Sequence, residues 1–380
     1  MQSNKLRFAI RATAVAATLG MAGTANAVSF DAGGWNTSIY GYARLNASYD
    51  IDENVSSSTR SFNYNAINVG AKEDNEATGY FGADAVQSRI GVKTTSPEGV
   101  TFNIEGDFRG NGGGDLRLRH AYGSYNGILA GQTWSNFTSF VGNTPTLDFD
   151  SLPGAAGYQS RTAQLRYTMG PLSVSAEQPQ NSLDGQIVLP ASVTKKDSMP
   201  AFTARFEDSQ GGLSYSAAVL AQQVGYDTGT ADDATFGFAT FVAAKMALTD
   251  MFTIQGSLSY TDGANSYLYR SGAPSAYVDA NGDVQTISGY GGTVGATMNL
   301  GSGRSVNLGY GMTSVDLDDA VKDGAADTGT TDVSAIMANY KWTPVKNVMM
   351  GVEYQYGTRE VQNGDDGDAS RLLFAAQYNF

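Results

Sequence analysis

Alternation of apolar and polar residues at every second position constrains this chain more than any other feature of its sequence. Between Ser305 and Val315 the apolar side chains Val306, Leu308, Tyr310 and Met312 share one face, and residues 253–261 and 347–356 repeat the pattern. A strand alternates in this way when one face meets an apolar phase and the other meets water. After the N-terminal segment no stretch of about 18 consecutive apolar residues occurs, which excludes membrane-spanning helices.

The first 27 residues have the pattern of a secretory signal peptide. Its three cations, Lys5, Arg7 and Arg11, lie in its first part, an apolar stretch runs from Phe8 to Met21, and Ala25-Asn26-Ala27 is a small-x-small cleavage site. The stretch is too short and too often interrupted for a transmembrane helix, which needs about 20 apolar residues. We expect residues 1–27 to be removed, leaving residues 28–380 as one domain. Loss of three cations and no acids shifts the formal charge from −13 to −16.

Sixteen alternating segments fill this domain. They lie at 37–50, 85–95, 100–109, 116–126, 128–134, 160–169, 172–178, 201–208, 213–223, 235–248, 251–262, 288–300, 304–315, 332–342, 347–358 and 370–380. Seven short connections interleave with eight long ones, and both ends of the domain lie on the short-turn side. The pattern predicts an all-β fold, a transmembrane antiparallel 16-stranded β-barrel with short periplasmic turns and long extracellular loops.

Proline and the aromatic residues agree with this map. All nine prolines fall between the predicted strands, as expected for a residue that has no N–H to donate to a sheet. Ten aromatic residues lie near strand ends, where girdles form at the membrane interfaces: Tyr40, Tyr42, Tyr49, Trp134, Tyr260, Tyr340, Trp342, Tyr354, Tyr356 and Tyr378. A soluble β-sandwich or propeller is the alternative, but its outward strand faces would be polar.

Composition excludes several kinds of chemistry. The chain has no cysteine, which rules out disulfides, thiol nucleophiles and thiolate-ligated metals, and its one histidine, His120, gives little basis for a zinc site. An acidic chain is a poor partner for nucleic acid, whose phosphates need clustered cations. Asp279 to Asp283 opens like a calcium loop, but Val284 and Tyr290 stand where glycine and glutamate are required. We therefore expect neither a metal nor any other cofactor.

Several motifs resemble a known family of outer-membrane proteins. The last strand alternates up to a terminal aromatic residue, Phe380, which resembles the signature read by the outer-membrane assembly machinery of Gram-negative bacteria. Residues 88–93, 116–122, 129–134, 147–149 and 161–168 resemble the DcaP-like branch of the trimeric porins. The resemblance implies a homotrimer in the outer membrane, in contact with lipid and lipopolysaccharide, that passes dicarboxylates and related anions. The helical N-terminal segment of some members has no counterpart here.

Whether a residue has an odd or even position along its strand, its parity, decides which face it occupies. Parity places most basic residues of the early strands on the water-filled side of the barrel. A charge facing lipid at the midplane would cost about 2–4 kcal/mol, so these side chains should point inward. The predicted pore-lining residues are Arg44, Arg89, Lys93, Arg109, Arg117, Arg119, Arg161 and Arg166. Arg161 shares its parity with Ala163 and Leu165, and only its place at the strand edge lets it turn inward. Acids instead crowd the first, seventh and eighth long loops, so net charge is a poor guide to selectivity.

The segment 135–159 is the candidate constriction loop. Its glycines and prolines suit a compact ordered connection, and the porin resemblance implies that it folds into the barrel, bringing Asp148, Asp150 and Tyr158 to the constriction. A loop of this length could equally cover the surface. The arginines of the wall could also pair with Glu105, Asp107, Asp148 and Asp150 and support the loop, without binding solute.

Three functions remain open from the sequence. The first is an outer-membrane porin that favours small organic anions, because guanidinium groups attract and grip carboxylates. The second is a general diffusion porin without charge preference. The third, a barrel-embedded hydrolase, would need His120 paired with a serine such as Ser124 and an acid, and we identify no catalytic residue.

Overall fold

The computed structural model describes residues 27–380 except 60, 76–77 and 185–194. Apart from Ala27, the predicted signal peptide therefore lies outside the described residues. Within them, no helix combines the length and the apolar character needed to cross a bilayer.

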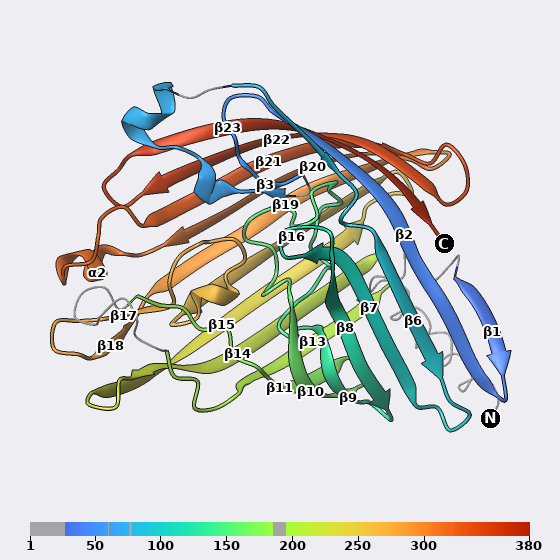
Figure 1. Cartoon of the computed structure of the whole chain (residues 1–380), viewed down its shortest axis with the longest axis horizontal. Coiled ribbons are helices and arrows are strands. Elements are labelled where there is room, and N and C mark those ends of the chain that lie inside the picture. Colours follow the sequence, from blue (N-terminus) through green and yellow to red (C-terminus); the bar gives the residue numbers. More distant parts are fainter. Residues whose placement is uncertain (1–26, 60, 76–77, 185–194) are drawn as a thin grey trace.

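A closed antiparallel barrel of 16 strands forms the body of the molecule (Figure 1). Its wall consists of β2 (Trp35–Asp50), β5 (Tyr80–Asp84) with β6 (Arg89–Thr95), β7 (Thr101–Gly110), β8 (Asp115–Tyr125), β9 (Ile128–Trp134), β10 (Arg161–Met169), β11 (Leu172–Glu177), β13 (Ala201–Gln210), β14 (Leu213–Asp227), β15 (Asp232–Ala247), β16 (Phe252–Asp262), β19 (Ser288–Gly301), β20 (Arg304–Val315), β21 (Thr330–Trp342), β22 (Val348–Val361) and β23 (Asp366–Asn379). Strands β5 and β6 pair with the same edge of β2 and together make one wall strand.

The barrel closes where β2 meets the last strand. Residues 42–50 of β2 pair with β23, and Gly41 exchanges backbone hydrogen bonds with Phe380. An additional short strand, β1 (Val28–Ala32), pairs with residues 35–39 of β2, beyond the point where the pairing of β2 with β23 ends. Both described ends of the chain therefore lie at the short-turn end of the barrel, as predicted.

The connections at the opposite end carry the remaining elements. These are β3 (Ser56–Ser58), β4 (Ser61–Phe62), the 3-10 turns η2 (Tyr64–Ala66), η3 (Gly70–Asn75) and η4 (Asn265–Tyr267), the small sheet of β12 (Leu183–Asp184), β17 (Ala276–Val278) and β18 (Val284–Thr286), and the short helix α2 (Asp318–Lys322).

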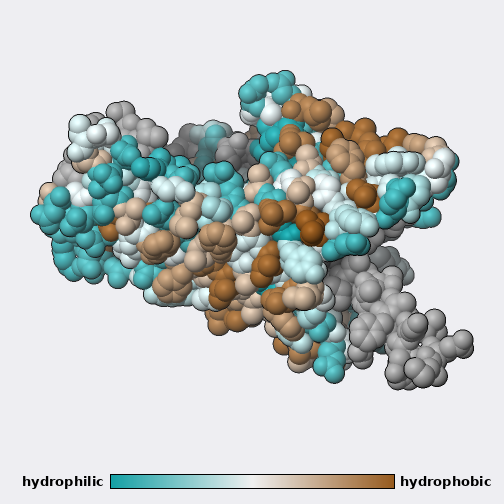
Figure 2. Space-filling model, turned by 90° about the horizontal axis from the view of Figure 1, so that it is seen from below, coloured by the Kyte–Doolittle hydropathy of each residue, from teal (hydrophilic) through white to brown (hydrophobic). Residues whose placement is uncertain are grey.

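The two faces of the wall differ as the alternation predicts. Outward side chains such as Leu258 and Val294 are more than 60% exposed, whereas their neighbours Ser257 and Thr293 are buried inside. Figure 2 shows apolar residues over the middle of the barrel and hydrophilic ones gathered at the long-loop end. The apolar band is the surface that faces lipid in a transmembrane barrel.

The sixteen predicted strands are confirmed, but three predicted long loops are wrong. The connections after β7, β14 and β22 span only residues 111–114, 228–231 and 362–365, because the strands run further than the alternation does. Above the lipid both faces of a strand meet water, so backbone pairing continues while the period-two signal disappears. No described proline lies within a strand; Pro190 lies outside the described residues.

Two connections besides 135–159 fold back over inward-facing side chains of the wall. Phe62, Tyr64 and Ile67, from the loop between β2 and β5, pack with Leu152 and with Met337 of β21. Tyr267, from the loop between β16 and β19, packs with Phe137 and the inward side chains of β15. The barrel interior therefore has an apolar core made by three loops, of which the sequence predicted one.

Candidate functional site

The loop 135–159 crosses the inside of the barrel. At its start the ring of Phe137 packs against Phe241 of β15, with ring centroids 5.0 Å apart. Further along, Leu147 is buried against Leu373 and Ala375 of β23. These contacts seat the loop on two separate parts of the wall, so the segment is interior and not surface cover.

Glycines on the inner wall make room for this loop. A Cβ at Gly295 of β19 would lie 1.9 Å from the Thr144 hydroxyl, and a Cβ at Gly311 of β20 would lie 2.3 Å from the Pro153 carbonyl oxygen. Neither distance is sterically possible. A side chain at position 311 would displace the backbone of the loop, and one at position 295 would force the Thr144 side chain to move. Glycines such as Gly295, in the glycine-rich sequence 289–295, thus relieve crowding inside the barrel.

Two wall carboxylates hold the loop by its backbone. Glu177 of β11 accepts hydrogen bonds from the Ser135 hydroxyl and the Asn136 N–H, both at 2.6 Å. Glu353 of β22 accepts the N–H groups of Leu147 at 2.7 Å and Asp148 at 2.9 Å. The sequence did not identify either residue, because the alternation shows that an acid faces inward but does not show which backbone N–H groups it will accept.

Arg270 ties the three interior loops together. Its guanidinium donates to the carbonyl oxygens of Ser151 and Phe62, lies over the Tyr64 ring at 4.3 Å, and approaches Asp148 to 3.9 Å. Burial disfavours the charge of Arg270, but Tyr64 and Asp148 outweigh burial and the pKa of the guanidinium is raised. Burial raises the pKa of the Asp148 carboxyl, against the attraction of Arg270.

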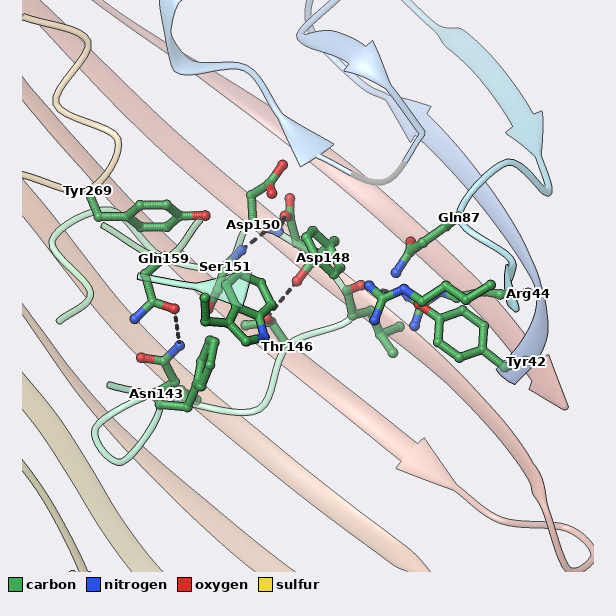
Figure 3. Close-up of a pocket in the computed structure, with 16 residues that line it drawn as sticks. Tyr42, Arg44, Gln87, Asn143, Thr146, Asp148, Asp150, Ser151, Gln159 and Tyr269 are labelled. Atoms are coloured by element: carbon green, nitrogen blue, oxygen red, sulfur yellow. Dashed lines mark hydrogen bonds between the residues drawn. The ribbon is translucent and has the colours of Figure 1, made fainter. Parts of the chain in front are cut away.

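A cavity of about 280 Å³ lies between this loop and the wall. Figure 3 shows Tyr42, Arg44 and Gln87 on one side of it and Asn143, Thr146 and Gln159 on the other. Arg89, Trp134, Phe140, Phe149 and Tyr269 complete the basic and aromatic part of the lining. Asp148 and Asp150 add negative charge to the lining, and the Asp150 N–H donates to Asp148 at 2.8 Å. The predicted constriction residue Tyr158 lies outside this cavity lining and donates to Gln180 at 2.8 Å.

Four of the predicted basic residues differ in their hydrogen-bond partners and in their distance from the cavity. Arg44 donates to the Leu147 carbonyl oxygen at 2.7 Å, and Arg166 donates to Gln164 and to the Trp134 carbonyl oxygen. Arg109 and Lys93 are half-buried on their strands, away from the cavity lining. Arg44 therefore helps to hold the loop, whereas Arg166 bonds to the wall strands β9 and β10, and all four side chains lie on the inner side of the wall.

Arg117 and Arg119 pair with acids of the neighbouring strand β7. Arg117 makes a two-point contact with Asp107, at 3.0 and 2.7 Å, and Arg119 donates to Glu105 at 2.7 Å. A register shift in the β7–β8 pairing turns Arg119 and His120 to the same side. His120 lies 3.0 Å from the Thr133 hydroxyl and 3.8 Å from Glu105, so its contacts differ from the serine pairing that a hydrolase would need.

Three arginines and three aromatic rings form an alternating series of contacts, the arginine–aromatic series. Its members, in order of contact, are Tyr42, Arg89, Phe149, Arg119, Trp134 and Arg161. Phe149 comes from the interior loop and the others from wall strands, and each guanidinium carbon lies 4.6–6.0 Å from a ring centroid. Cation–π contacts of this kind contribute about 0.5–2 kcal/mol each. They also separate like charges by rings. The contact with Trp134 shows that Arg161 turns inward despite its parity.

The series corrects part of the predicted aromatic girdle. Tyr42 and Trp134 contact arginines inside the barrel, and Tyr40 is buried and donates to Asn103 at 2.9 Å. Tyr49, Tyr260, Tyr354 and Tyr378 are exposed on the outside, as a girdle requires. Parity could have identified the inward pair, because Tyr40 and Tyr42 have the same parity as Arg44.

Within the described residues, no cluster of three or more His, Asp or Glu side chains is placed to hold a metal ion. Asp279 accepts the N–H groups of Asn281 and Asp283 in its own turn. The arrangement of the site is therefore that of a charged, partly aromatic wall facing an internal loop.

Comparison with known proteins relates this architecture to channels. Residues 21–380 match the family model described as DcaP outer membrane protein. The crystal structure of the outer membrane channel DcaP of Acinetobacter baumannii is 28% identical, with 93% of this chain and 100% of that chain covered and a TM-score of 0.78. No curated protein sequence matches.

More distant solved structures share the fold. The anion-selective porin from Comamonas acidovorans is 14% identical over 91% of this chain and 100% of that chain, with a TM-score of 0.58. OmpF of Salmonella typhi is 14% identical over 93% of this chain and 100% of that chain, with a TM-score of 0.55. At such identities the likeness concerns the barrel alone.

Proposed function

This chain belongs to the DcaP outer membrane protein family, and from that membership we propose that it lets small hydrophilic solutes diffuse passively through the barrel and favours small organic anions such as dicarboxylates. The chain is a porin-type barrel of the Gram-negative outer membrane, and its family and structural neighbours include channels and porins. A porin needs no catalytic residue, because its selectivity comes from pore width and the charges that line it.

The observation that carries the preference for anions is the excess of guanidinium groups on the inner wall from β6 to β10. Within the described part of this wall, Arg89, Arg117 and Arg119 lie near two buried acids, Glu105 and Asp107, and Arg161 lies against the Trp134 ring. Lys93, Arg109 and Arg166 also face inward on these strands, so the cations outnumber the two acids and this wall is positive, although the chain as a whole is acidic. In a narrow lumen between low-dielectric walls, such a field raises the local concentration of anions.

Several partners follow from the same membership. From the resemblance to the trimeric porins we propose a homotrimer for this chain. The outward apolar band would contact outer-membrane lipid and lipopolysaccharide. Phe380, paired to Gly41 at the barrel seam, would be the residue read by the outer-membrane assembly machinery. Small anionic solutes are the proposed cargo.

Uptake into liposomes tests the proposal against a general diffusion porin. Proteoliposomes would be swollen in succinate, in a neutral polyol and in a diamine of similar size, with each rate normalised to that of protein-free vesicles. We expect succinate to enter fastest and the diamine slowest. Equal rates for the three solutes would support a pore without charge preference, and a faster diamine would contradict the proposal.

A further inference from the structure

We propose that Arg89 is the group that binds the carboxylate of a passing solute, and that Tyr42 and Phe149 are the residues that position it. The inference rests on the proposed function and deepens it, because it assigns solute binding to one of the eight predicted basic residues. It also gives the aromatic residues of the lumen a part in selectivity.

Arg89 differs from the other arginines of the wall in its hydrogen bonding. Its Nε is buried with no hydrogen-bond partner, and none of the hydrogen bonds among the described residues involves its guanidinium. The nearest carboxylate oxygen, on Glu105, is 3.9 Å away. The same oxygen receives the Arg119 Nε at 2.7 Å. Arg89 thus keeps donors that the protein itself does not use.

An unused buried donor is costly. Leaving a buried polar group without a partner destabilises a protein, and the cost is larger for a charged group. A solute carboxylate would supply the missing acceptors, because its two oxygens match the paired N–H groups of a guanidinium. The Arg89 side chain is 16% exposed, so until a solute arrives water in the lumen can bind the N–H groups that are not buried.

The surroundings direct Arg89 towards the lumen. Its neighbours Ile90 and Val92 on β6 are exposed on the outside, so Arg89 points inward. Its guanidinium carbon lies 5.0 Å from the Tyr42 ring, on the paired strand, and 5.0 Å from the Phe149 ring, on the interior loop. Arg89 and both rings border the 280 Å³ cavity. The rings restrict the long side chain, which lowers the entropy lost when it grips a carboxylate.

The acids near the cavity are already engaged. Asp107 receives Arg117 and Arg119. The Asp148 carboxylate accepts the N–H groups of Phe62, Asp150 and Ser151 and the amide of Gln355. Asp150 also borders the cavity, and its charge acts on Arg270. A solute carboxylate that binds Arg89 therefore competes only with the 3.9 Å contact between Arg89 and Glu105, and the shorter ion pairs of the wall stay intact.

A comparison of charge and shape at position 89 tests the proposal. Chloride current through single channels would be measured while succinate is added, giving the concentration at which succinate reduces the current by half. Arg89→Lys keeps the charge but loses the planar two-point donor. Because the charge is kept, we expect the reversal potential in a KCl gradient to stay on the chloride side, while the half-blocking succinate concentration rises about tenfold.

Three further variants separate positioning from support. Phe149→Leu and Tyr42→Leu should each raise the half-blocking concentration at least twofold, whereas Tyr42→Phe, which keeps the ring, should match the wild type. Lys93→Met removes one charge from the same face of β6. It should weaken the anion preference and leave the half-blocking concentration within twofold. Each variant is first checked for the gel shift of a folded barrel.

The outcomes distinguish the two proposals. A wild-type channel that prefers anions, together with an Arg89→Lys variant that is blocked by succinate as readily as wild type, would overturn the role of Arg89 and leave the proposed function standing. A wild-type channel that prefers cations would overturn both.

Discussion

Replacing Glu353 by alanine should release the interior loop from the wall of β22. Glu353 is fully buried, and its two oxygens accept the N–H groups of Leu147 and Asp148 at 2.7 and 2.9 Å. Hydrogen bonds to a charged acceptor contribute about 1.5–3 kcal/mol each. Water in the lumen can satisfy part of what is lost, so we take the value of one bond, about 1.5–3 kcal/mol. That shifts the opening equilibrium of the loop by roughly 10- to 100-fold, since about 1.4 kcal/mol is a factor of ten.

The absence of native cysteine provides the assay. A single Leu147→Cys substitution places a unique thiol at a position that is 1% exposed. Its rate of modification by a small water-soluble thiol reagent follows the population of the open loop. In this background Glu353→Ala should label at least tenfold faster. Glu353→Gln, which keeps one acceptor oxygen, should fall between the two.

A matched control lies on the same strand. Glu360, near the end of β22, is exposed and makes no side-chain contact with the interior loop among the described residues. Glu360→Ala should leave labelling at position 147 unchanged. If Glu353→Ala folds and labels within twofold of its parent, the two backbone hydrogen bonds do not hold the loop, and the reasoning is refuted.

Three further predictions concern packing and charge inside the barrel. Gly295→Ala should speed labelling of the thiol introduced at position 147, because its Cβ would meet the Thr144 hydroxyl. Gly123→Ala, whose nearest neighbour is 3.9 Å away, should have no effect. Equal rates for the two variants would contradict this packing. Arg371→Met should leave Asp50 buried without its 3.0 Å partner and destabilise the barrel by about 3–5 kcal/mol. The loss is measured as a lower temperature at which heated samples no longer give the folded band on a gel. The double variant Asp50→Leu with Arg371→Met should recover part of the loss, and no recovery would argue against a buried charge as the cause. Arg270→Met should free Ser151 and Phe62 and increase single-channel conductance and current noise; unchanged traces would show that the three loops do not depend on it.

The strands could be predicted from the sequence because lipid enforces the pattern that reveals them. Wherever one face of a strand meets hydrocarbon, as at Leu258 or Val294, its neighbours along the strand alternate and the parity can be read directly. The ends of β14 and β22 lost this signal, since both faces meet water there. The position of a strand was therefore predictable, whereas its length beyond the membrane was not.

The interior of the barrel was only partly predictable. Parity places Arg44, Arg89 and Arg117 inside, but it does not show which of them bonds to an acid or to a loop. The change of side at His120 depends on a register shift between β7 and β8, which leaves no mark in the sequence of either strand. Arg270 and Glu353 hold backbone groups that are distant in the chain, so their roles arise only from the folded arrangement.

The burial of Phe62 and Tyr64 was likewise missed. Aromatic residues in a long external loop are compatible with a surface position, and nothing local distinguishes them from residues that pack inside. Their neighbour Gly357 on β22 would meet both rings at 3.0 Å if it carried a Cβ, so the fit is a property of two segments together.

The reversal potential of the wild-type channel in a KCl gradient tests the central claim most directly. The positive wall from β6 to β10 should govern ion passage although the chain carries a formal charge of −13. We therefore expect a potential displaced towards the chloride equilibrium value, with a displacement that shrinks as salt screens the wall. A potential displaced towards the potassium value would contradict it.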